Sequence, residues 1–225
     1  MEKINVALDG PAGAGKSTVA RHVAKAMDYI YVDTGAMYRA ITWKALQLGI
    51  RPEDTEAVIE TARNMKLELF AHESGQQVYV DGENVTELIR SQEVNRAVSI
   101  IAQIPEVRQL LVEKQKKIAA AKGVVMDGRD IGSSVLPDAE VKIFLTASPR
   151  IRAERRFKEM NQPGIDLDEL EKQICQRDEM DRNRVHSPLV QAEDAVLLDT
   201  SDMDLNEVVE AVLKLCRSKV TGEGN

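Results

Sequence analysis

The stretch Gly10-Pro11-Ala12-Gly13-Ala14-Gly15-Lys16-Ser17 matches the G-x-x-x-x-G-K-[ST] pattern of a phosphate-binding loop. Residues 4–8 alternate like a short strand before it, and after it apolar side chains recur every four residues, as on one face of a helix. The motif needs this order, because the loop N–H groups and the helix N-terminus both face the phosphates. The alternative is a glycine-rich turn with an incidental Lys-Ser pair, and this context disfavours it. The sequence therefore predicts a nucleoside triphosphate site.

The loop residues have separate expected roles. Lys16 can reach the β- and γ-phosphates of ATP, and the Ser17 hydroxyl can bind the accompanying Mg²⁺. We expect Ser17 and Asp33 to be the metal ligands. The expected ATP contacts are Gly10, Pro11, Ala12, Gly13, Ala14, Gly15, Lys16, Ser17 and Thr18.

The composition limits the possible partners. The chain has 225 residues, 43% of them hydrophobic, enough for a substantial core in one domain or in one core with insertions. A net charge of −7 argues against a general nucleic-acid or membrane-surface binder. No stretch reaches the roughly 20 apolar residues of a membrane span, and two cysteines are too few for a disulfide framework. We expect a cytoplasmic protein with no nucleic-acid or membrane partner, and a monomer, because no stretch indicates an interface.

The hydrophobic pattern predicts an α/β fold. Strand-like runs at 4–8, 29–32, 124–126, 141–145 and 196–198 alternate with helical patterns, which indicates a parallel sheet covered on both faces. Residues 66–90 differ, with two alternating runs around Glu73-Ser74-Gly75 and a second turn at Asp81-Gly82. They predict a small antiparallel hairpin or meander.

The segment Asp33-Thr34-Gly35-Ala36-Met37-Tyr38-Arg39 follows the second strand-like run. In an open α/β sheet, ligands bind beyond the carboxyl ends of the strands, so Arg39 could offer a bidentate fork to a second phosphate. An ordinary helix start, with Thr34 as N-cap and Arg39 in solvent, explains the residues equally well. Position alone leaves both interpretations open.

The segment Val124-Val125-Met126-Asp127-Gly128-Arg129-Asp130 has the form of a Walker B strand, an apolar run that ends in an acid. Asp127 can assist Mg²⁺ directly or through water, while Arg129 and Asp130 place a guanidinium and a carboxylate at the same sheet edge. A strand followed by a surface turn with an Arg–Asp pair is the alternative. The position and the charges favour a functional role.

Residues 150–158 carry five cationic side chains and one acidic one in an otherwise acidic protein. Arg152 and Arg156 are like charges four residues apart, which destabilises a helix without an anion nearby. Further on, the spacing predicts Arg177, Asp181 and Arg184 on one face of a helix. A solvated, salt-bridged surface is the alternative. We favour a mobile lid that closes arginines over the transferring phosphoryl group.

Five motifs, in this order and spacing, carry a resemblance to a known family: GPAGAGKST, DTGAMYR, SQEVNRAVSIIAQIPEVR, DGRDIG and RDEMDRNR. The chain resembles the bacterial cytidylate kinases over nearly its whole length. DGRD stands where adenylate kinases carry D-G-[FY]-P-R, which counts against that sister family.

The resemblance implies the fold of the nucleoside-monophosphate kinases. This is an α/β fold whose five-stranded parallel sheet is flanked by helices, with a CMP-binding insertion of a small antiparallel sheet plus helices, and a helical lid. The implied domains are a core of residues 1–33, 107–147 and 185–225, a monophosphate-binding domain of 34–106, and a lid of 148–184.

The resemblance also implies transfer of the γ-phosphoryl group of ATP to CMP or dCMP, with Mg²⁺. Arg39, Arg129 and Arg184 would hold the CMP phosphate, with Asp181 and Arg177 at the ribose and phosphate. Ser99, Arg108 and Asp130 would read the cytosine, and Tyr38 would border the pocket. Thr34 stands where some members have Ser. The implied substrate contacts are Thr34, Tyr38, Arg39, Ser99, Arg108, Asp127, Arg129, Asp130, Arg177, Asp181 and Arg184. The implied catalytic residues are Lys16, Arg129, Arg152, Arg156 and Arg184.

Other functional classes fit the sequence less well. A regulatory GTPase needs N-K-x-D and D-x-x-G motifs, and the sequence has neither. A shikimate-type kinase shares the short loop and lid but has no use for a nucleotide-binding insertion with base-reading residues. A non-catalytic ATP-binding module should lack the second anion site at Arg39, Arg129 and Arg184. The remaining alternative is another nucleoside-monophosphate kinase, such as a UMP/CMP kinase.

Overall fold

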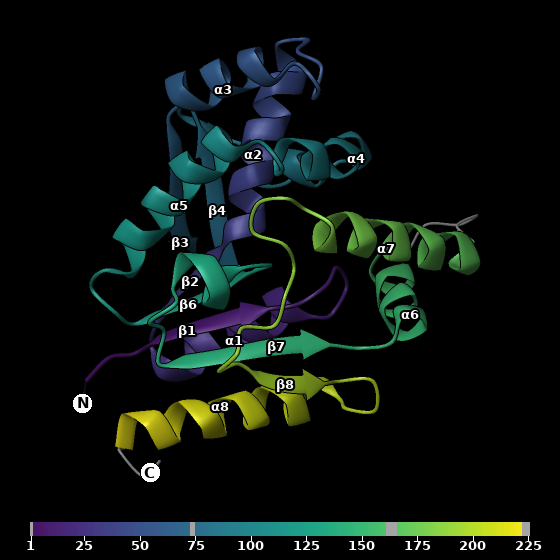
Figure 1. Cartoon of the computed structure of the whole chain (residues 1–225). Coiled ribbons are helices and arrows are strands. Elements are labelled where there is room, and N and C mark those ends of the chain that lie inside the picture. The colour runs from purple at the N-terminus through teal and green to yellow at the C-terminus, as the bar shows by residue number, and fades with distance from the viewer. Residues whose placement is uncertain (1, 73–74, 161–165, 222–225) are drawn as a thin grey trace. The chain divides into compact units, whose positions relative to one another are not determined.

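The computed structural model describes residues 2–72, 75–160 and 166–221. The chain divides into two compact units (Figure 1). Unit 1 comprises residues 1–29 and 122–225, and unit 2 comprises residues 30–121.

A parallel sheet is the framework of the fold. Over the described residues it has five strands in the order β2-β6-β1-β7-β8. β1 pairs in parallel with β6 on one side and with β7 on the other, and β7 pairs with β8. Every strand-like run that the sequence predicts is a strand, with slightly different ends, so the predicted α/β class is confirmed. The strands are β1 (Asn5–Asp9), β2 (Ile30–Asp33), β6 (Val124–Gly128), β7 (Val141–Thr146) and β8 (Val196–Asp199).

Helices flank the sheet within unit 1. α1 (Lys16–Met27) contacts β1 and β6, and α8 (Leu205–Thr221) contacts β7 (Figure 1). A π-helical turn, η2 (Ile131–Val135), follows β6. The charged segment forms α6 (Pro149–Met160) and α7 (Leu167–Arg182), which pack on each other through Ala153, Leu170 and Ile174. That this pair moves as a lid stays a prediction.

Unit 2 has its own hydrophobic core. Its helices are α2 (Thr34–Gln47), α3 (Thr55–Asn64), α4 (Gln92–Ile101) and α5 (Pro105–Ala119), with a 3-10 turn, η1 (Leu88–Arg90). Met37 and Ile41 of α2, Ile101 of α4 and Leu111 of α5 are buried in one cluster with Val78. Because α5 shares this core, it lies in unit 2, whereas most of it falls in the core domain of the expected division at 34–106. The functional division of the chain stays a prediction.

A small antiparallel sheet completes unit 2, as the sequence predicts. Its strands are β3 (Leu67–His72), β4 (Gly75–Val80) and β5 (Glu83–Asn84), in the order β3-β4-β5. Asp81 and Gly82 both have positive φ, 52° and 86°, as a two-residue type I′ turn requires. In the first predicted turn, Glu73 and Ser74 lie outside the described residues.

The end of β1 fixes where the phosphate loop begins. Gly10 has φ of 147°, and a Cβ atom there would lie 1.9 Å from the carbonyl oxygen of Leu145 in β7. A side chain at this position would force the loop and β7 apart. Gly15 also has positive φ, 83°, but a Cβ atom there would have open space around it.

We expect Gly10→Ala to destabilise the protein by about 3 kcal/mol or more, because backbone strain adds to a clash with a backbone atom. Gly15→Ala is the matched control and should cost about 1 kcal/mol, from backbone strain alone. Urea unfolding of the nucleotide-free variants measures both. Equal costs for the two variants would contradict the importance of this contact.

Candidate nucleotide-binding site

The phosphate loop joins β1 to α1. α1 begins at Lys16, and its N-cap, Gly15, provides no side-chain hydrogen bond to the first turn. The N–H groups at a helix start that lack a side-chain cap are suited to bind an anion, and the helix dipole favours negative charge there. The geometry therefore agrees with the motif.

Lys16 is a buried cation among other cations. Its side chain is almost fully enclosed, and Nζ donates to the Pro11 carbonyl at 2.8 Å. Burial lowers the pKa of Lys16 to about 7, and Arg129 and Arg177 act in the same direction, against Asp127 and Asp9. A polyphosphate would supply the negative charge that favours the protonated amine.

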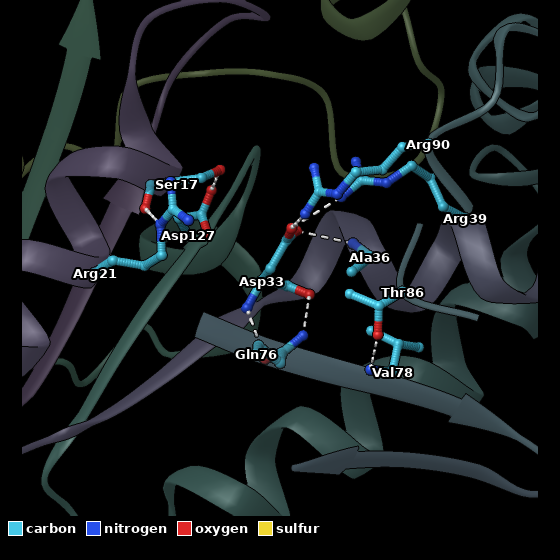
Figure 2. Close-up of polar contacts among 10 residues, drawn as sticks. All are labelled: Ser17, Arg21, Asp33, Ala36, Arg39, Gln76, Val78, Thr86, Arg90 and Asp127. Atoms are coloured by element: carbon cyan, nitrogen blue, oxygen red, sulfur yellow. Dashed lines mark hydrogen bonds and ion pairs between the residues drawn. The ribbon is translucent and has the colours of Figure 1, made fainter. Parts of the chain in front are cut away.

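Ser17 and Asp127 form an oxygen-rich pair beside this lysine. The Ser17 hydroxyl donates to Asp127 Oδ2 at 2.8 Å (Figure 2). Among the described residues, no group of three or more His, Cys, Asp or Glu side chains is suited to hold a metal ion. Mg²⁺ usually takes one or two protein oxygens together with substrate phosphates and water, so this pair fits it.

Asp33 uses its carboxylate within unit 2. Oδ1 accepts from the Ala36 N–H at 2.8 Å, and Oδ2 pairs with Arg39 at 2.8 Å and with Arg90 at 3.7 Å (Figure 2). Asp33, not Thr34, is therefore the N-cap of α2, because the helix begins at Thr34 itself. The alternative of a solvated Arg39 is also wrong, since that side chain is only 15% exposed. Asp33 as a metal ligand stays a prediction.

Asp181 joins two of the predicted phosphate-binding arginines. Its carboxylate accepts from Arg129 Nε at 2.8 Å and from Arg184. Burial alone would raise the pKa of Asp181, but Arg129, Arg184 and Arg177 outweigh it and hold the pKa below its ordinary value. Together with Lys16, these guanidinium groups give unit 1 a concentrated positive charge beside the phosphate loop.

The expected helical face of Arg177, Asp181 and Arg184 is only partly correct. Arg177 and Asp181 lie in α7, but α7 ends at Arg182 with Asn183 as its C-cap. The i+7 spacing therefore fails at Arg184, which reaches Asp181 from beyond the helix end.

The two predicted lid arginines have different environments. Arg152 is buried, donates to the carbonyls of Ala147 and Ala12 at 2.9 Å each, and pairs with Asp178 at 2.7 Å. Arg156 is half-buried and makes no ion pair with the part of the chain that the structure describes. Arg152 therefore holds a phosphate-loop carbonyl, and contact of either arginine with a phosphate stays a prediction.

The predicted base-reading residues divide between the units. Ser99 of α4 and Arg108 of α5 are both buried in unit 2, where the Arg108 guanidinium lies 5.7 Å from the centre of the Tyr38 ring. This cation–π contact joins two predicted pocket residues. Asp130, also buried, follows β6 in unit 1.

Sequence reasoning missed two buried carboxylates in unit 1. Asp9 accepts hydrogen bonds from backbone N–H groups after Asp130, and Asp178 is the partner of Arg152. An acid at the end of a mostly apolar strand, directly before the loop, was the available signal for Asp9. No sequence signal distinguished Asp178 from the other acids of α7.

A glycine-rich loop with a buried lysine, at the carboxyl end of the central strand of a parallel sheet and beside clustered arginines, defines a phosphate-loop kinase. Comparisons with known proteins support and refine this class. Residues 6–218 match the family model described as cytidylate kinase. The chain belongs to the cytidylate kinase family.

Relatives match over nearly the whole chain. The cytidylate kinase of Caldanaerobacter subterraneus subsp. tengcongensis is 50% identical over 222 residues, covering 98% of this chain and 97% of that protein. The cytidylate kinase of a Geobacillus species is 49% identical, covering 96% and 98%. Shikimate kinase from Bacteroides thetaiotaomicron has a similar fold, with a TM-score of 0.51, 15% identity, and coverage of 96% of this chain and 99% of that one.

No helix in the described ranges is long and apolar enough to span a membrane.

We expect Asp181→Asn to destabilise the protein by about 3 kcal/mol at neutral pH, because two largely enclosed guanidinium groups lose their counter-charge. The pKa of Asp181 is lowered in the folded state, so its contribution is present above the unfolded-state pKa and is lost as the pH falls through the folded-state value. The difference from wild type should therefore shrink below about pH 4.

Asp168→Asn is the control for this prediction, since Asp168 also lies in α7 and pairs with an arginine but is 74% exposed. It should change stability by less than about 1 kcal/mol. Urea unfolding at several pH values measures both variants. A cost for Asp181→Asn that is small, or that does not change with pH, would contradict this account of the arginine cluster.

Proposed function

We propose that this chain transfers the γ-phosphoryl group of ATP to CMP, and to dCMP, giving CDP or dCDP and ADP. The observation that carries the proposal is the crowding of Lys16, Arg129, Arg177 and Arg184 beside the phosphate loop, where Lys16 has its pKa lowered. So much positive charge suits two phosphorylated ligands better than one. We infer CMP as the acceptor from the family, because the family model and the relatives are named cytidylate kinase.

The chemistry needs charge neutralisation more than a base. An ionised oxygen of the CMP phosphate attacks the γ-phosphorus, and the bond from that phosphorus to the β–γ bridging oxygen breaks, so that ADP leaves. Because the attacking oxygen is already ionised, no proton must be removed first. His22, His72 and His186 are all exposed, which agrees with a site without a histidine base.

Each part of the site has a proposed role. Lys16 follows the transferring phosphoryl group, while Arg39, Arg129 and Arg184 hold the CMP phosphate. Ser17 and Asp127 are the proposed Mg²⁺ ligands, directly or through water, and Mg²⁺ would neutralise charge on the ATP phosphates. Action as a monomer, and in the cytoplasm, stays a prediction.

Lys16→Ala should leave a folded protein whose turnover is lower by several orders of magnitude, since a preorganised charge at the transferring group is lost. Lys25→Ala is the control, because Lys25 lies on the exposed side of the same helix. A coupled assay of ADP release, with far-UV circular dichroism for folding, measures both. Near-normal turnover of folded Lys16→Ala would be incompatible with the proposed loop function.

The acceptor is tested by comparing kcat/KM for CMP, dCMP, UMP and AMP. Cytosine presents an amino donor where uracil presents a carbonyl, so a carboxylate at Asp130 and a hydroxyl at Ser99 can favour CMP. A mismatch leaves buried groups unpaired, at about 1–3 kcal/mol each. We expect wild type to prefer CMP to UMP by roughly tens to thousands, and Ser99→Ala and Asp130→Ala each to narrow this ratio.

Ser218→Ala in α8 is the control for these substitutions and should leave the CMP/UMP ratio unchanged. Loss of Asp130 can also lower the rate with both acceptors, since it adjoins Arg129, so the ratio is the quantity to compare. A ratio that neither Ser99→Ala nor Asp130→Ala changes would show that these residues do not read the base. A wild-type preference for UMP would favour a UMP/CMP kinase.

A further inference from the structure

Asp9, the last residue of β1, is a buried carboxylate with two backbone partners. Its side chain is almost fully enclosed, Oδ1 accepts from the Ile131 N–H at 2.8 Å, and Oδ2 accepts from the Gly132 N–H at 2.7 Å. These N–H groups begin η2, the turn that directly follows Asp130. One carboxylate thus joins the strand that enters the phosphate loop to the segment that carries Arg129 and Asp130.

We propose that Asp9 is a positioning residue that holds the Arg129–Asp130 segment in place for CMP. The inference rests on the proposed function, since it assumes that this segment binds the acceptor nucleotide. Asp9 would act through its two hydrogen bonds to the turn and need not touch a nucleotide itself.

The two ends of this connection differ in how the backbone is hydrogen-bonded. β1 is held on both sides, since Asp9 lies opposite Gly128 of β6 and Phe144 of β7. The turn after Asp130 is one π-helical turn, whose first N–H groups have no partner within the turn and need other acceptors, because buried donors are costly without them. A fixed carboxylate that accepts from both therefore sets the position of the turn, and with it the residues directly before the turn.

The surroundings of Asp9 suit this role. The turn packs closely around the carboxylate, since a Cβ atom on Gly132 would lie at ordinary contact distance, 3.4 Å, from Asp9 Oδ2 and 3.2 Å from Lys142 Cδ. Lys142 binds both oxygens of Asp194, at 2.7 and 2.9 Å, and is thereby engaged elsewhere. Burial raises the pKa of Asp9 to about 6, against the opposing effect of the two N–H groups, so the carboxylate is mostly ionised at pH 7.5.

Asp9→Asn is the sharpest test, because it keeps the shape and replaces one accepting oxygen with an amide that cannot accept. Glu140→Gln is the matched control. Glu140 accepts from the Asn5 N–H at 2.8 Å and pairs with Lys122, so it also binds β1, at the opposite end of the strand. Thermal unfolding and steady-state kinetics with CMP, UMP and ATP are measured for both variants and for wild type.

For folded Asp9→Asn we expect kcat/KM for CMP to fall about tenfold or more, mainly through a higher KM for CMP, as for a lost charge-assisted hydrogen bond. The charge of Asp9 also favours the protonated form of Lys16, so kcat can fall with both acceptors, and the KM values and the CMP/UMP ratio are the quantities to compare. The KM for ATP should stay within about twofold, and the CMP/UMP ratio should narrow, because Asp130 shifts with the turn. Glu140→Gln should leave all three quantities near wild type. A purely structural role would lower stability without separating the two substrates.

Three results would overturn the inference: an unchanged KM for CMP, equal increases in KM for CMP and ATP, or the same kinetic change in Glu140→Gln. If Asp9→Asn does not fold, Asp9→Glu decides, since it keeps two accepting oxygens but displaces them from the turn by one methylene, and it should narrow the CMP/UMP ratio; an unchanged ratio there rejects the proposal. Failure of the wild-type protein to phosphorylate CMP would instead contradict the proposed function.

Discussion

The way in which β1 ends is the constraint on which the phosphate site depends. The strand is paired in parallel with β6 and β7, and Gly10 lies so close to the Leu145 carbonyl that no other residue fits. The chain therefore passes close to β7 at Gly10, where the loop that leads to α1 begins. Asp9, which precedes Gly10 at the end of β1, accepts two hydrogen bonds from the turn after β6. The end of β1 therefore positions both the phosphate loop and the segment that carries Arg129 and Asp130.

Within each unit, buried carboxylates organise the cationic groups. Asp181 accepts from Arg129 and Arg184, Asp178 pairs with Arg152, and within unit 2 Asp33 pairs with Arg39. Such a pair contributes little net stability compared with apolar side chains of similar volume, because desolvation offsets much of the attraction, although removal of one partner alone is costly. Their effect is to restrict the guanidinium groups to a few orientations before any ligand binds, and preorganised charge is the main source of catalysis in phosphoryl transfer. Burial disfavours the protonated form of Lys16, and the negative phosphates of ATP would favour that form again by raising the pKa of the amine.

Local sequence signals predicted the elements, and tertiary contacts decided the details. The phosphate loop, the five strand-like runs and the turn at Asp81-Gly82 follow from glycine placement and hydrophobic alternation, which act over a few residues. The partners of the charged side chains could not be predicted in this way, since Arg129 and Asp181 are 52 positions apart in the chain. Helical spacing placed Arg184 on α7, but the helix ends before it. The sequence led us to expect Asp33 as a metal ligand. It did not predict that Asp33 caps α2 and pairs with Arg39, because these contacts depend on the residue at which that helix begins.

The central claim is that the chain binds two nucleotides at once, one of them through cytosine. Calorimetric binding of a bisubstrate analogue, in which five phosphates join adenosine to cytidine, tests it directly. Linking two ligands that bind together raises affinity strongly, so this analogue should bind at least about 100-fold more tightly than ATP, and more tightly than its uridine counterpart. A cytidine analogue that binds no more tightly than ATP would contradict the account.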